Sequence, residues 1–393
     1  MSKRQRLRLG AFGVGRMGRV HLENLIRLTR KGQIEFTAIG DRYSPTLTAA
    51  DNLVVELGGS VLGERLAKCA TPEEMVSACK LDAVVIASRT EDHARDSLAF
   101  TRHGIPVLLE KPFANSVADA VEFCRNLDGA GQRLVQVAFN RFYDAAAQAA
   151  MDWAARGLVG EVQQSHHVLQ DKNPTPPAYQ SCGITADMAI HLVFEALCFH
   201  GFQLPSQVQA LRFMAPHYND RAGEGANIVH VFCTWPGGSV AHLWGSRINN
   251  TGYDNGFKLI GTEGRIDVGE FAGDFGVIRA KLWRGTGRGP GARGTLAGNR
   301  RFPMSRPRAD HPDFYARFAR AYASELDAFL KHLHARTPFA VGPEIGWKTL
   351  LVANTAEASS RLGGRRFELA VKDGGPVRTV EDAAEFAARS GVP

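Results

Sequence analysis

Several features of membrane, secreted and metal-scaffolded proteins are missing from this sequence. No apolar run approaches the roughly 20 residues that a helix needs to cross a bilayer. The six cysteines form no Cys-x-x-Cys pair and show neither metal-ligand spacing nor a disulfide framework. The basic start MSKRQRLRL runs straight into a glycine-rich motif, which leaves no room for the apolar core of a signal peptide. We therefore expect a cytoplasmic protein without a membrane partner, a disulfide or a bound metal.

Acidic residues are also missing from the segment between Phe275 and Ala309, which holds eight arginines, one lysine and many glycines. The whole chain has a formal net charge of +7, so this segment accounts for its basic character. A long, basic surface loop over about 279–308 is the expected structure, either solvated or in contact with another subunit or a phosphate-bearing ligand. Nucleic acid is not the expected partner, because only Trp283 and Phe302 interrupt the basic run as stacking candidates.

A glycine-rich motif follows the first expected strand. Leu7–Phe12 is apolar enough to form that strand, G-V-G-R-M-G follows at residues 13–18, and apolar residues then recur from Val20 with the spacing of a helix. In such a unit the three glycines permit a tight turn, a close approach of a pyrophosphate to the backbone, and close packing of the helix on the strand. The N–H groups at the helix N-terminus then bind the phosphates. The motif predicts a dinucleotide site formed by Gly13, Gly15, Arg16, Met17 and Gly18.

An acidic residue ends the second expected strand. Asp41 closes Ile34–Asp41, at the distance from the last glycine where a carboxylate binds the adenosine ribose. Such a carboxylate repels a 2′-phosphate, so we predict NAD as the cofactor. Arg42 follows directly and could pair with that phosphate, which keeps NADP as the alternative.

The alternation of strands and helices continues to about residue 138. Further strands are expected at Leu81–Ala87, Ile105–Leu109 and Arg133–Phe139, and helices from Glu91 and from Ser116, a candidate N-cap. Uniformly apolar strands are typical of a parallel sheet covered on both faces, so residues 1–138 are expected to form a doubly wound Rossmann domain. Ligands bind beyond the carboxyl ends of such strands. The residues expected to contact the cofactor there are Ser88, Thr90, His93, Glu110, Lys111, Pro112 and Asn140.

The charged pair Glu110-Lys111 directly follows an apolar strand and precedes Pro112. Proline restricts the residue before it to extended backbone, so the lysine side chain is aimed in one direction. A cis Lys111–Pro112 bond is one geometry that the sequence allows. We interpret Glu110 as a positioning residue rather than a proton carrier.

The pattern changes after Asn140. Five stretches between residues 162 and 261 alternate apolar and polar residues, which indicates an antiparallel sheet with one face toward solvent or another subunit. Two helices are expected near 313–335 and 343–361. Residues 139–393 are therefore expected to form a second, α+β domain.

Between two of these strands, Gly183–Leu197 has the character of a helix, and Asp187 and His191 lie four residues apart on one face. A neutral imidazole is suited to taking a proton near pH 7. The carboxylate one turn away could orient the imidazole or hold a substrate hydroxyl. A surface or capping pair is the alternative interpretation. Zinc is not expected, because no third ligand lies at a conventional spacing.

Three motifs taken together resemble those of the glucose–fructose oxidoreductase, inositol dehydrogenase and rhizopine catabolism (Gfo/Idh/MocA) family: G-x-G-x-x-G at 13–18, E-K-P at 110–112 and D-x-x-x-H at 187–191. The resemblance covers nearly the whole chain. It implies a Rossmann domain followed by an α+β domain with a large, mainly antiparallel open sheet, often used for homodimer or homotetramer contacts. The stretches most similar to the inositol 2-dehydrogenase branch are 132–144, 252–254 and 322–329.

By position, the resemblance implies that Lys111 contacts a substrate hydroxyl and the nicotinamide region, that Asp187 binds substrate, and that His191 is the catalytic acid/base. Arg141 and Tyr253 are further candidates for substrate contacts. The implied activity is oxidation of a secondary alcohol of a cyclitol, sugar or sugar derivative to a ketone, with NAD as the hydride acceptor. Lys111 would stabilise the developing oxyanion, and His191 would take the hydroxyl proton.

Two departures from the family pattern bear on the substrate. Inositol dehydrogenases tend to read H-E-I-D after the histidine, whereas this chain reads H-L-V-F from His191 to Phe194. The approach to the aspartate, Asn173–Gly183, also looks altered. These differences favour a less polar, modified or larger sugar-like substrate over a bare polyol.

Two further hypotheses remain for the activity. One is an NADPH-dependent keto-sugar reductase. The other is a non-catalytic dinucleotide-binding regulator of the same family. The regulator ranks lower, because such proteins can dispense with the lysine or the histidine, and this chain retains both.

Overall fold

The computed structural model describes residues 6–127, 129–171, 181–216, 225–269, 276–287 and 293–393. The chain folds into two compact units. The first unit comprises residues 1–115, 119–139 and 322–347, and the second comprises residues 116–118, 140–321 and 348–393. The chain passes from the first unit to the second after residue 139, next to the division expected at 138/139. Residues 322–347 then return to the first unit.

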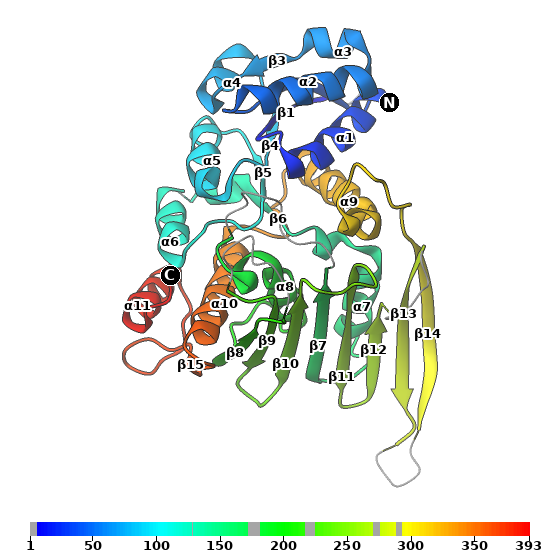
Figure 1. Ribbon diagram of the computed structural model, residues 1–393, viewed down its shortest axis with the longest axis vertical. Helices are drawn as coiled ribbons and strands as arrows, with labels where there is room; N and C mark the ends of the chain where they lie inside the picture. Colours follow the sequence, from blue (N-terminus) through cyan, green and yellow to red (C-terminus); the bar gives the residue numbers. More distant parts are fainter. Residues whose placement is uncertain (1–5, 128, 172–180, 217–224, 270–275, 288–292) are drawn as a thin grey trace. The chain divides into compact units, whose positions relative to one another are not determined.

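The first unit is built on a six-stranded sheet in which the pairings are parallel. The strand order β3-β2-β1-β4-β5-β6 is that of a doubly wound dinucleotide-binding fold (Figure 1). This confirms the predicted Rossmann architecture. The strands are β1 (Leu7–Phe12), β2 (Ile34–Gly40), β3 (Ala67–Cys69), β4 (Ala83–Ile86), β5 (Val107–Glu110) and β6 (Val135–Ala138).

Helices connect these strands and cover the sheet. Every residue of β4, β5 and β6 is buried, as expected for parallel strands with helices on both faces. The helical elements are α1 (Arg16–Arg30), α2 (Ser44–Gly58), α3 (Ser60–Arg65), α4 (Pro72–Ala78), η1 (Thr90–Asp92), α5 (His93–Thr101), α6 (Val117–Asn126) and η2 (Gly131–Leu134).

A helix from the far end of the chain completes the core of this unit. The second half of α9 (Asp313–Ala335) belongs to the first unit. Its residues Leu326 and Phe329 are fully buried and pack in one apolar cluster with Leu22 and Leu25 of α1. The dinucleotide-binding sheet is therefore supported by residues about 300 positions beyond the glycine motif, which no local pattern in the sequence indicates.

The second unit is built on a nine-stranded sheet with the order β14-β13-β12-β11-β7-β10-β9-β8-β15. The pairing of β7 with β10 is parallel and the other pairings are antiparallel, so the predicted open, mainly antiparallel sheet is confirmed. Its strands are β7 (Val162–Gln170), β8 (Gln207–Phe213), β9 (Ile228–Thr234), β10 (Val240–Ser246), β11 (Asp254–Gly261), β12 (Gly264–Val268), β13 (Val277–Gly285), β14 (Gly294–Pro303) and β15 (Phe367–Glu368).

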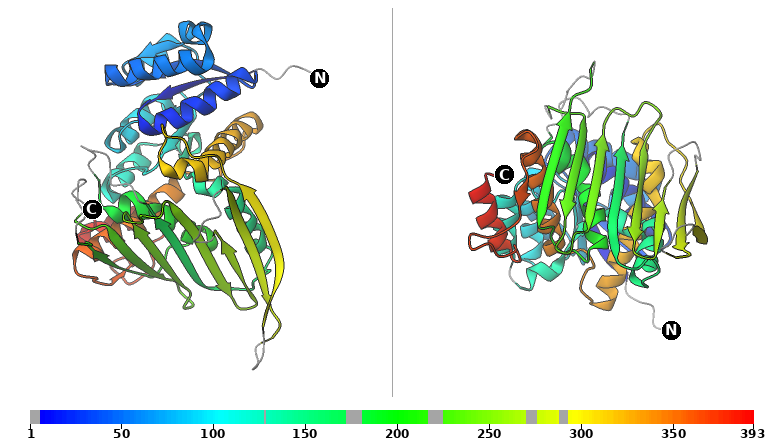
Figure 2. Two further views of the ribbon diagram at one scale, coloured as in Figure 1. Left: turned by 45° about the vertical axis from the view of Figure 1, so that its right-hand side comes forward. Right: turned by 90° about the horizontal axis from the view of Figure 1, so that it is seen from below.

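Helices pack on one face of this sheet (Figure 2). The helices predicted near 313–335 and 343–361 are confirmed as α9 and α10. Within the described ranges, no helix combines the length and the apolarity that crossing a membrane requires. The helical elements of the second unit are η3 (Asn140–Tyr143), α7 (Ala145–Ala155), the π-helical turn η4 (Thr185–Ala189), α8 (Ile190–Phe199), most of α10 (Pro343–Arg361) and α11 (Val380–Ser390).

The opposite face of the sheet carries a row of rings. His242 stacks on Phe232 with ring centroids 4.8 Å apart, and its Nε2 lies 3.0 Å from Nδ1 of His230. The ring of Trp244 stacks on His230, and His166 meets His242 edge to face. Phe232 and Trp244 are each 38% exposed. This surface, formed by His166, His230, Phe232, His242 and Trp244, is called the ring face below.

The prediction of a long basic loop over 279–308 is wrong. β13 and β14 pair as antiparallel strands over most of that range, and residues 288–292 lie outside the described residues. Ala280 and Leu282 of β13 are buried in a cluster with Trp153 of α7, whereas their neighbours on the strand are less buried. The many arginines and glycines of the segment obscure, in the sequence, the alternation of buried and less buried residues that is typical of a strand. The arginines suit β14 because charged side chains protect an edge strand from pairing with another chain.

Candidate active site

The glycine motif forms the turn between β1 and α1. Gly13 has a φ of +80°, and a Cβ there would lie 2.1 Å from the backbone nitrogen of Ser88. A Cβ at Gly18 would lie 2.2 Å from the carbonyl oxygen of Gly13. A Cβ at Gly15 would meet nothing within 4 Å. Two glycines are therefore fixed by packing, whereas the middle glycine faces open space, as close approach of a pyrophosphate requires.

The N-terminus of α1 has the electrostatic character of an anion site. Its N-cap is Gly15, so no side chain occupies the first N–H groups of the helix. Arg16 is exposed and Met17 is half-buried at the first turn. A pocket of about 390 Å³ opens beside them. Its lining includes Val14, Gly15, Arg16, Arg19, Tyr43 and Thr46. The rest of the lining is mainly apolar, so it is the N–H groups of the helix N-terminus and the neighbouring Arg16 that suit the phosphates of a dinucleotide.

Asp41 and Arg42 have different partners at the end of β2. The Asp41 carboxylate accepts hydrogen bonds from the backbone N–H groups of Val14, at 2.9 Å, and Tyr43, also at 2.9 Å. It thereby ties the glycine turn to the second strand and keeps lone pairs for a ribose hydroxyl. Arg42 donates two hydrogen bonds to Asp96, at 2.9 and 2.5 Å, and its pKa is raised by that carboxylate.

Ser88, Thr90 and His93 follow β4. The hydroxyl of Ser88 is buried and has no hydrogen-bond partner among the residues that the structure describes, so a ligand could supply one. Thr90 opens η1 and is half-buried. His93 is 1% exposed, and both ring nitrogens lie near backbone carbonyl oxygens: Nδ1 is 2.8 Å from that of Pro112 and Nε2 is 3.1 Å from that of Ser88.

The Glu110-Lys111-Pro112 segment closes β5. Glu110 is 4% exposed, its Oε1 lies 2.8 Å from Nε2 of His21, and its Oε2 accepts the backbone N–H of Lys111 at 3.1 Å. Lys111 is half-buried. The Lys111–Pro112 peptide bond is cis, which confirms that expectation. These contacts agree with the interpretation of Glu110 as a positioning residue.

A second buried acid in this region escaped the sequence analysis. Glu325 on α9 is 0% exposed, and neither carboxyl oxygen has a hydrogen-bond partner within the described part of the chain. Burial, and then the charge of Glu110, raises the pKa of Glu325 well above its ordinary value. The only signal in the sequence was a glutamate in the middle of an amphipathic helix.

In the second unit, Asp187 and His191 stand out by exposure. From Gly183 to Leu197 every residue is buried except these two, which are partly exposed. Asp187 lies in the π-helical turn η4 and His191 in the first turn of α8. The helix predicted for this stretch therefore exists, with a wider turn at its start. Residues 172–180, which include most of the altered approach to the aspartate, lie outside the described residues.

Two long-range contacts hold the start of this helix. Asp187 Oδ2 accepts a hydrogen bond from Arg247, which follows β10, at 2.9 Å. Glu357 of α10 is 2% exposed and accepts the backbone N–H of Thr185 at 3.1 Å. A Cβ at Gly183 would lie 2.3 Å from the carboxyl carbon of Glu357, so only glycine fits between them. Neither Arg247 nor Glu357 has a local sequence signal.

A buried polar network joins the expected substrate residues Arg141 and Tyr253. Arg141 is 2% exposed and donates hydrogen bonds to Glu195, at 2.8 Å, and to the Tyr253 hydroxyl, at 3.2 Å. Nδ1 of His167 lies 3.3 Å from the same glutamate. Burial alone would raise the pKa of Glu195, but Arg141 and His167 lower it. Burial raises the pKa of Tyr253, which keeps its hydroxyl protonated. Asn140 is buried at the start of η3.

Glu195 was missed, although a signal existed. It lies four residues after His191, as His191 lies four after Asp187, and it interrupts an apolar stretch. It is therefore an acid one turn further along the same helix. Leu192 and Phe194, which take the place of polar residues in the family pattern, are each 0% exposed and belong to the core.

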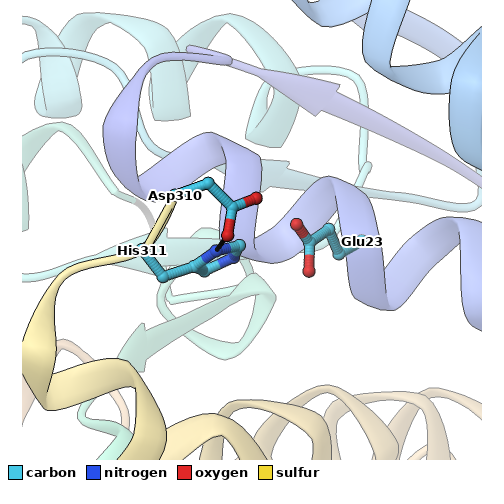
Figure 3. A group of neighbouring side chains, drawn as sticks. All are labelled: Glu23, Asp310 and His311. Atoms are coloured by element: carbon cyan, nitrogen blue, oxygen red, sulfur yellow. Dashed lines mark hydrogen bonds and ion pairs between the residues drawn. The ribbon is translucent and has the colours of Figure 1, made fainter. Parts of the chain in front are cut away.

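An aspartate–histidine pair precedes α9. Asp310 Oδ1 lies 3.0 Å from Nδ1 of His311 (Figure 3). Arg308 also donates two hydrogen bonds to Asp310, and these bonds lower the pKa of that carboxyl. A guanidinium thus already balances the carboxylate, and we assign this pair no ligand. Glu23, drawn in the same figure, belongs to α1 of the first unit.

Two family models match the chain. The Gfo/Idh/MocA oxidoreductase family with an NAD-binding Rossmann fold matches residues 7–139, and the Gfo/Idh/MocA C-terminal domain matches residues 147–267. The chain belongs to the Gfo/Idh/MocA family. Its first unit is an NAD-binding Rossmann domain, and the protein is an oxidoreductase.

This oxidoreductase is similar to inositol dehydrogenases. It is 27% identical over 336 residues to inositol 2-dehydrogenase of Rhodococcus jostii, an alignment that covers 84% of this chain and 82% of the relative. It is 24% identical over 369 residues to the scyllo-inositol 2-dehydrogenase (NAD(+)) of Bacillus subtilis, which covers 93% and 97%. The structure of scyllo-inositol dehydrogenase from Lactobacillus casei with bound NAD(H) and scyllo-inositol superposes with a TM-score of 0.73 at 19% identity, covering 93% of this chain and 99% of that one. The last likeness shows the shared fold.

Proposed function

We propose that this oxidoreductase oxidises a secondary alcohol of a cyclitol, or of a related sugar or sugar derivative, to a ketone. Bound NAD would supply the nicotinamide that accepts the hydride. The observation that carries the proposal is that Asp187 and His191 are partly exposed while every other residue from Gly183 to Leu197 is buried. A helical stretch that leaves a carboxylate and an imidazole accessible one turn apart, with buried residues between them, is suited to bind and deprotonate a hydroxyl.

Each residue then has a defined role. Nε2 or Nδ1 of His191 takes the proton of the reacting hydroxyl, and Asp187, held by Arg247, accepts a hydrogen bond from a substrate hydroxyl. The Lys111 ammonium stabilises the charge that develops on the oxygen. Arg141 and Tyr253 are proposed as further substrate contacts.

The cofactor is proposed to bind along the carboxyl ends of the first sheet. Gly15 and the α1 N-terminus would hold the pyrophosphate, and Asp41 the adenosine ribose. Arg42 favours NAD over NADP, because both of its terminal nitrogens already bind the buried carboxylate of Asp96. The remaining residues proposed to contact the dinucleotide are Gly13, Arg16, Met17, Gly18, Ser88, Thr90, Glu110, Lys111, Pro112 and Asn140. The direct contact expected of His93 is not proposed, because the ring is buried and both of its nitrogens already face backbone carbonyl oxygens.

A polyhydroxylated substrate is favoured over the less polar one that the sequence suggested. Leu192, Val193 and Phe194 are buried in the core, so they do not set the polarity of a substrate-binding surface. Glu195, Arg141 and Tyr253 form a polar network instead. The similarity to inositol 2-dehydrogenases supports the same choice.

Assembly through the open sheet is proposed as well. The ring face exposes large apolar side chains, and burying such a surface favours association. A homodimer or homotetramer formed through this face is the arrangement expected. Sedimentation velocity on the wild type and on Trp244→Glu tests it, since a charge on a buried face should shift the oligomer toward monomer.

Turnover tests the proposed chemistry. Cyclitols, aldoses and sugar acids are offered with NAD or NADP, and formation of the reduced nicotinamide is followed by absorbance. His191→Ala should lower kcat on the best substrate by about 10²–10⁴-fold, the usual contribution of a general base. The matched control is His103→Ala, an exposed histidine of the first unit.

Three results would contradict the proposal. Undiminished turnover in His191→Ala would exclude His191 as the base. Higher affinity for NADPH than for NADH would favour the keto-sugar reductase. Tight NADH binding without turnover of any polyol would favour the non-catalytic regulator.

A further inference from the structure

The carboxyl end of β5 is held on both sides of Lys111. Before it, both oxygens of Glu110 are engaged, one by Nε2 of His21 and one by the backbone N–H of Lys111 itself. After it, the carbonyl oxygen of Pro112 is engaged by Nδ1 of His93. The lysine backbone therefore lies between two anchored neighbours, and each anchor ends in a buried imidazole.

The His21 contact defines one ring nitrogen as the donor. A carboxylate oxygen is an acceptor, so we assign to Nε2 of His21 the proton that faces Glu110. His21 is 1% exposed, and its ring meets Tyr322 of α9 edge to face, with centroids 5.9 Å apart. The imidazole is thus fixed by packing, and through it the direction of the Glu110 carboxylate.

The His93 contact defines the other nitrogen. Burial lowers the pKa of His93, so the ring is neutral near pH 7 and has a single N–H. We assign that proton to Nδ1, because its contact with the Pro112 oxygen, 2.8 Å, is shorter than the 3.1 Å from Nε2 to the Ser88 oxygen. Nε2 faces the Ser88 oxygen, so one ring contacts the carboxyl ends of both β4 and β5.

Glu325 makes the Glu110 anchor directional. It lies close enough for the charge of Glu110 to raise its pKa, and it is kept neutral by burial. Glu325 makes no hydrogen bond to Glu110 in the described part of the chain, and the two oxygens of Glu110 are directed at Nε2 of His21 and at the backbone N–H of Lys111. The acid of the motif is therefore buried and held through both of its oxygens.

We propose that His21 and His93 are positioning residues for Lys111: His21 acts through Nε2 on Glu110 and His93 acts through Nδ1 on Pro112, and together they fix the direction of the Lys111 ammonium. The inference rests on the role proposed for Lys111 and extends it to two buried residues that act through the neighbours of the lysine. His93 thereby has a role distinct from the direct cofactor contact expected from the sequence.

Crossed substitutions test this assignment. The amide nitrogen of asparagine occupies a position close to Nδ1 of histidine, and that of glutamine a position close to Nε2. His93→Asn and His21→Gln therefore keep the required donor, whereas His93→Gln and His21→Asn move it. Asparagine keeps the donor at residue 93 and glutamine keeps it at residue 21. At each position, the variant that keeps the donor is therefore the matched control for the variant that moves it.

Two measurements are made on each folded full-length variant. The first is kcat and KM with NAD and the best polyol. The second needs no turnover: the rate at which a small acylating reagent modifies the Lys111 amine, measured by peptide mass spectrometry. We expect kcat to fall about 10–100-fold in His93→Gln and His21→Asn with KM little changed, since a displacement of about 1 Å costs that much. We expect the Lys111 labelling rate to change at least threefold in the same two variants. His93→Asn and His21→Gln should stay within about threefold of wild type in both measurements.

Lys111→Ala separates this inference from the proposed function. If Lys111→Ala retains full turnover, the role proposed for Lys111 is wrong, and the labelling rates alone decide whether the two histidines position the side chain. If Lys111→Ala is inactive but the Asn and Gln variants at each histidine behave alike, the positioning assignment is overturned. Equal loss in all four variants would mean that the histidines are needed only for packing, which also overturns it.

Discussion

Glu325 should make the protein less stable at neutral pH than a neutral side chain would. It is 0% exposed, without a hydrogen-bond partner for either oxygen among the described residues, and its pKa is raised by burial and by Glu110. Below pH 4.5 the carboxyl is protonated in both the folded and the unfolded chain. Above it the unfolded chain ionises while the folded chain keeps its proton, so stability falls as pH rises toward the folded-state pKa.

The size of the effect follows from linkage. Each pH unit above the ordinary pKa costs about 1.4 kcal/mol, so roughly 3 kcal/mol is lost by pH 7 for as long as the folded state remains protonated. Glu325→Gln has the same shape and cannot ionise in either state. The variant should match the wild type near pH 4.5 and unfold at higher denaturant concentration than the wild type at pH 7 and 8.

Chemical denaturation between pH 4.5 and 8 measures this difference. Glu64→Gln on α3, an exposed glutamate of the same unit, is the control and should give parallel curves for variant and wild type. A constant offset between Glu325→Gln and wild type across the pH range would refute the reasoning, because it would mean that Glu325 ionises equally in both states.

Three further effects are expected in the second unit. Glu357→Ala should destabilise the chain by about 2–3 kcal/mol and lower kcat, because it leaves the buried N–H of Thr185 without its carboxylate acceptor. Chemical denaturation measures the first effect and steady-state kinetics the second. An unchanged kcat would mean that the helix keeps its place without this contact. Arg141→Met should cost about 3–5 kcal/mol by leaving Glu195 charged and buried, and adding Glu195→Gln should recover part of that loss in the same assay; a larger loss in the double variant would contradict the pairing. Burial, and then the neighbouring histidines, lower the pKa of His242 to about 4. Below pH 6.5 the unfolded chain therefore binds a proton at this residue that the folded chain does not, so the free energy of unfolding decreases as pH falls from 6.5 toward 4. His242→Gln should flatten that acid limb in a thermal-unfolding series, and an unchanged limb would exclude His242 as its source.

Short-range patterns in the sequence predict much of the fold. The glycine turn, the uniformly apolar strands and the helical period of the last two long helices are each set by neighbours within a few residues, so the Rossmann sheet and α9 and α10 could be predicted. The strand ends could be predicted as well, because in a parallel sheet they share one edge. Asp187 and His191 could be singled out as candidates because their spacing is the repeat of a single helix.

The remaining features depend on contacts between distant residues. The Gly/Arg-rich segment forms strands because Ala280 and Leu282 are buried in one cluster with Trp153. The glycines and arginines around these two residues give no sequence signal of that burial. By its sequence position Arg42 is available to a phosphate. In the structure it donates hydrogen bonds to Asp96, which lies 54 residues further along the chain. Such pairings are decided by the packing of whole elements, which leaves no periodic trace.

The E-K-P segment shows the same division. The sequence by itself placed Lys111 at a strand end and predicted that Glu110 positions it. Only the tertiary structure supplied His21, His93 and Glu325 around that segment, because they come from three helices spread over the chain and meet at β5 only when the core of the first unit closes. The sequence thus determined where the lysine lies along the chain, and the packing of those helices decided how its neighbours are held.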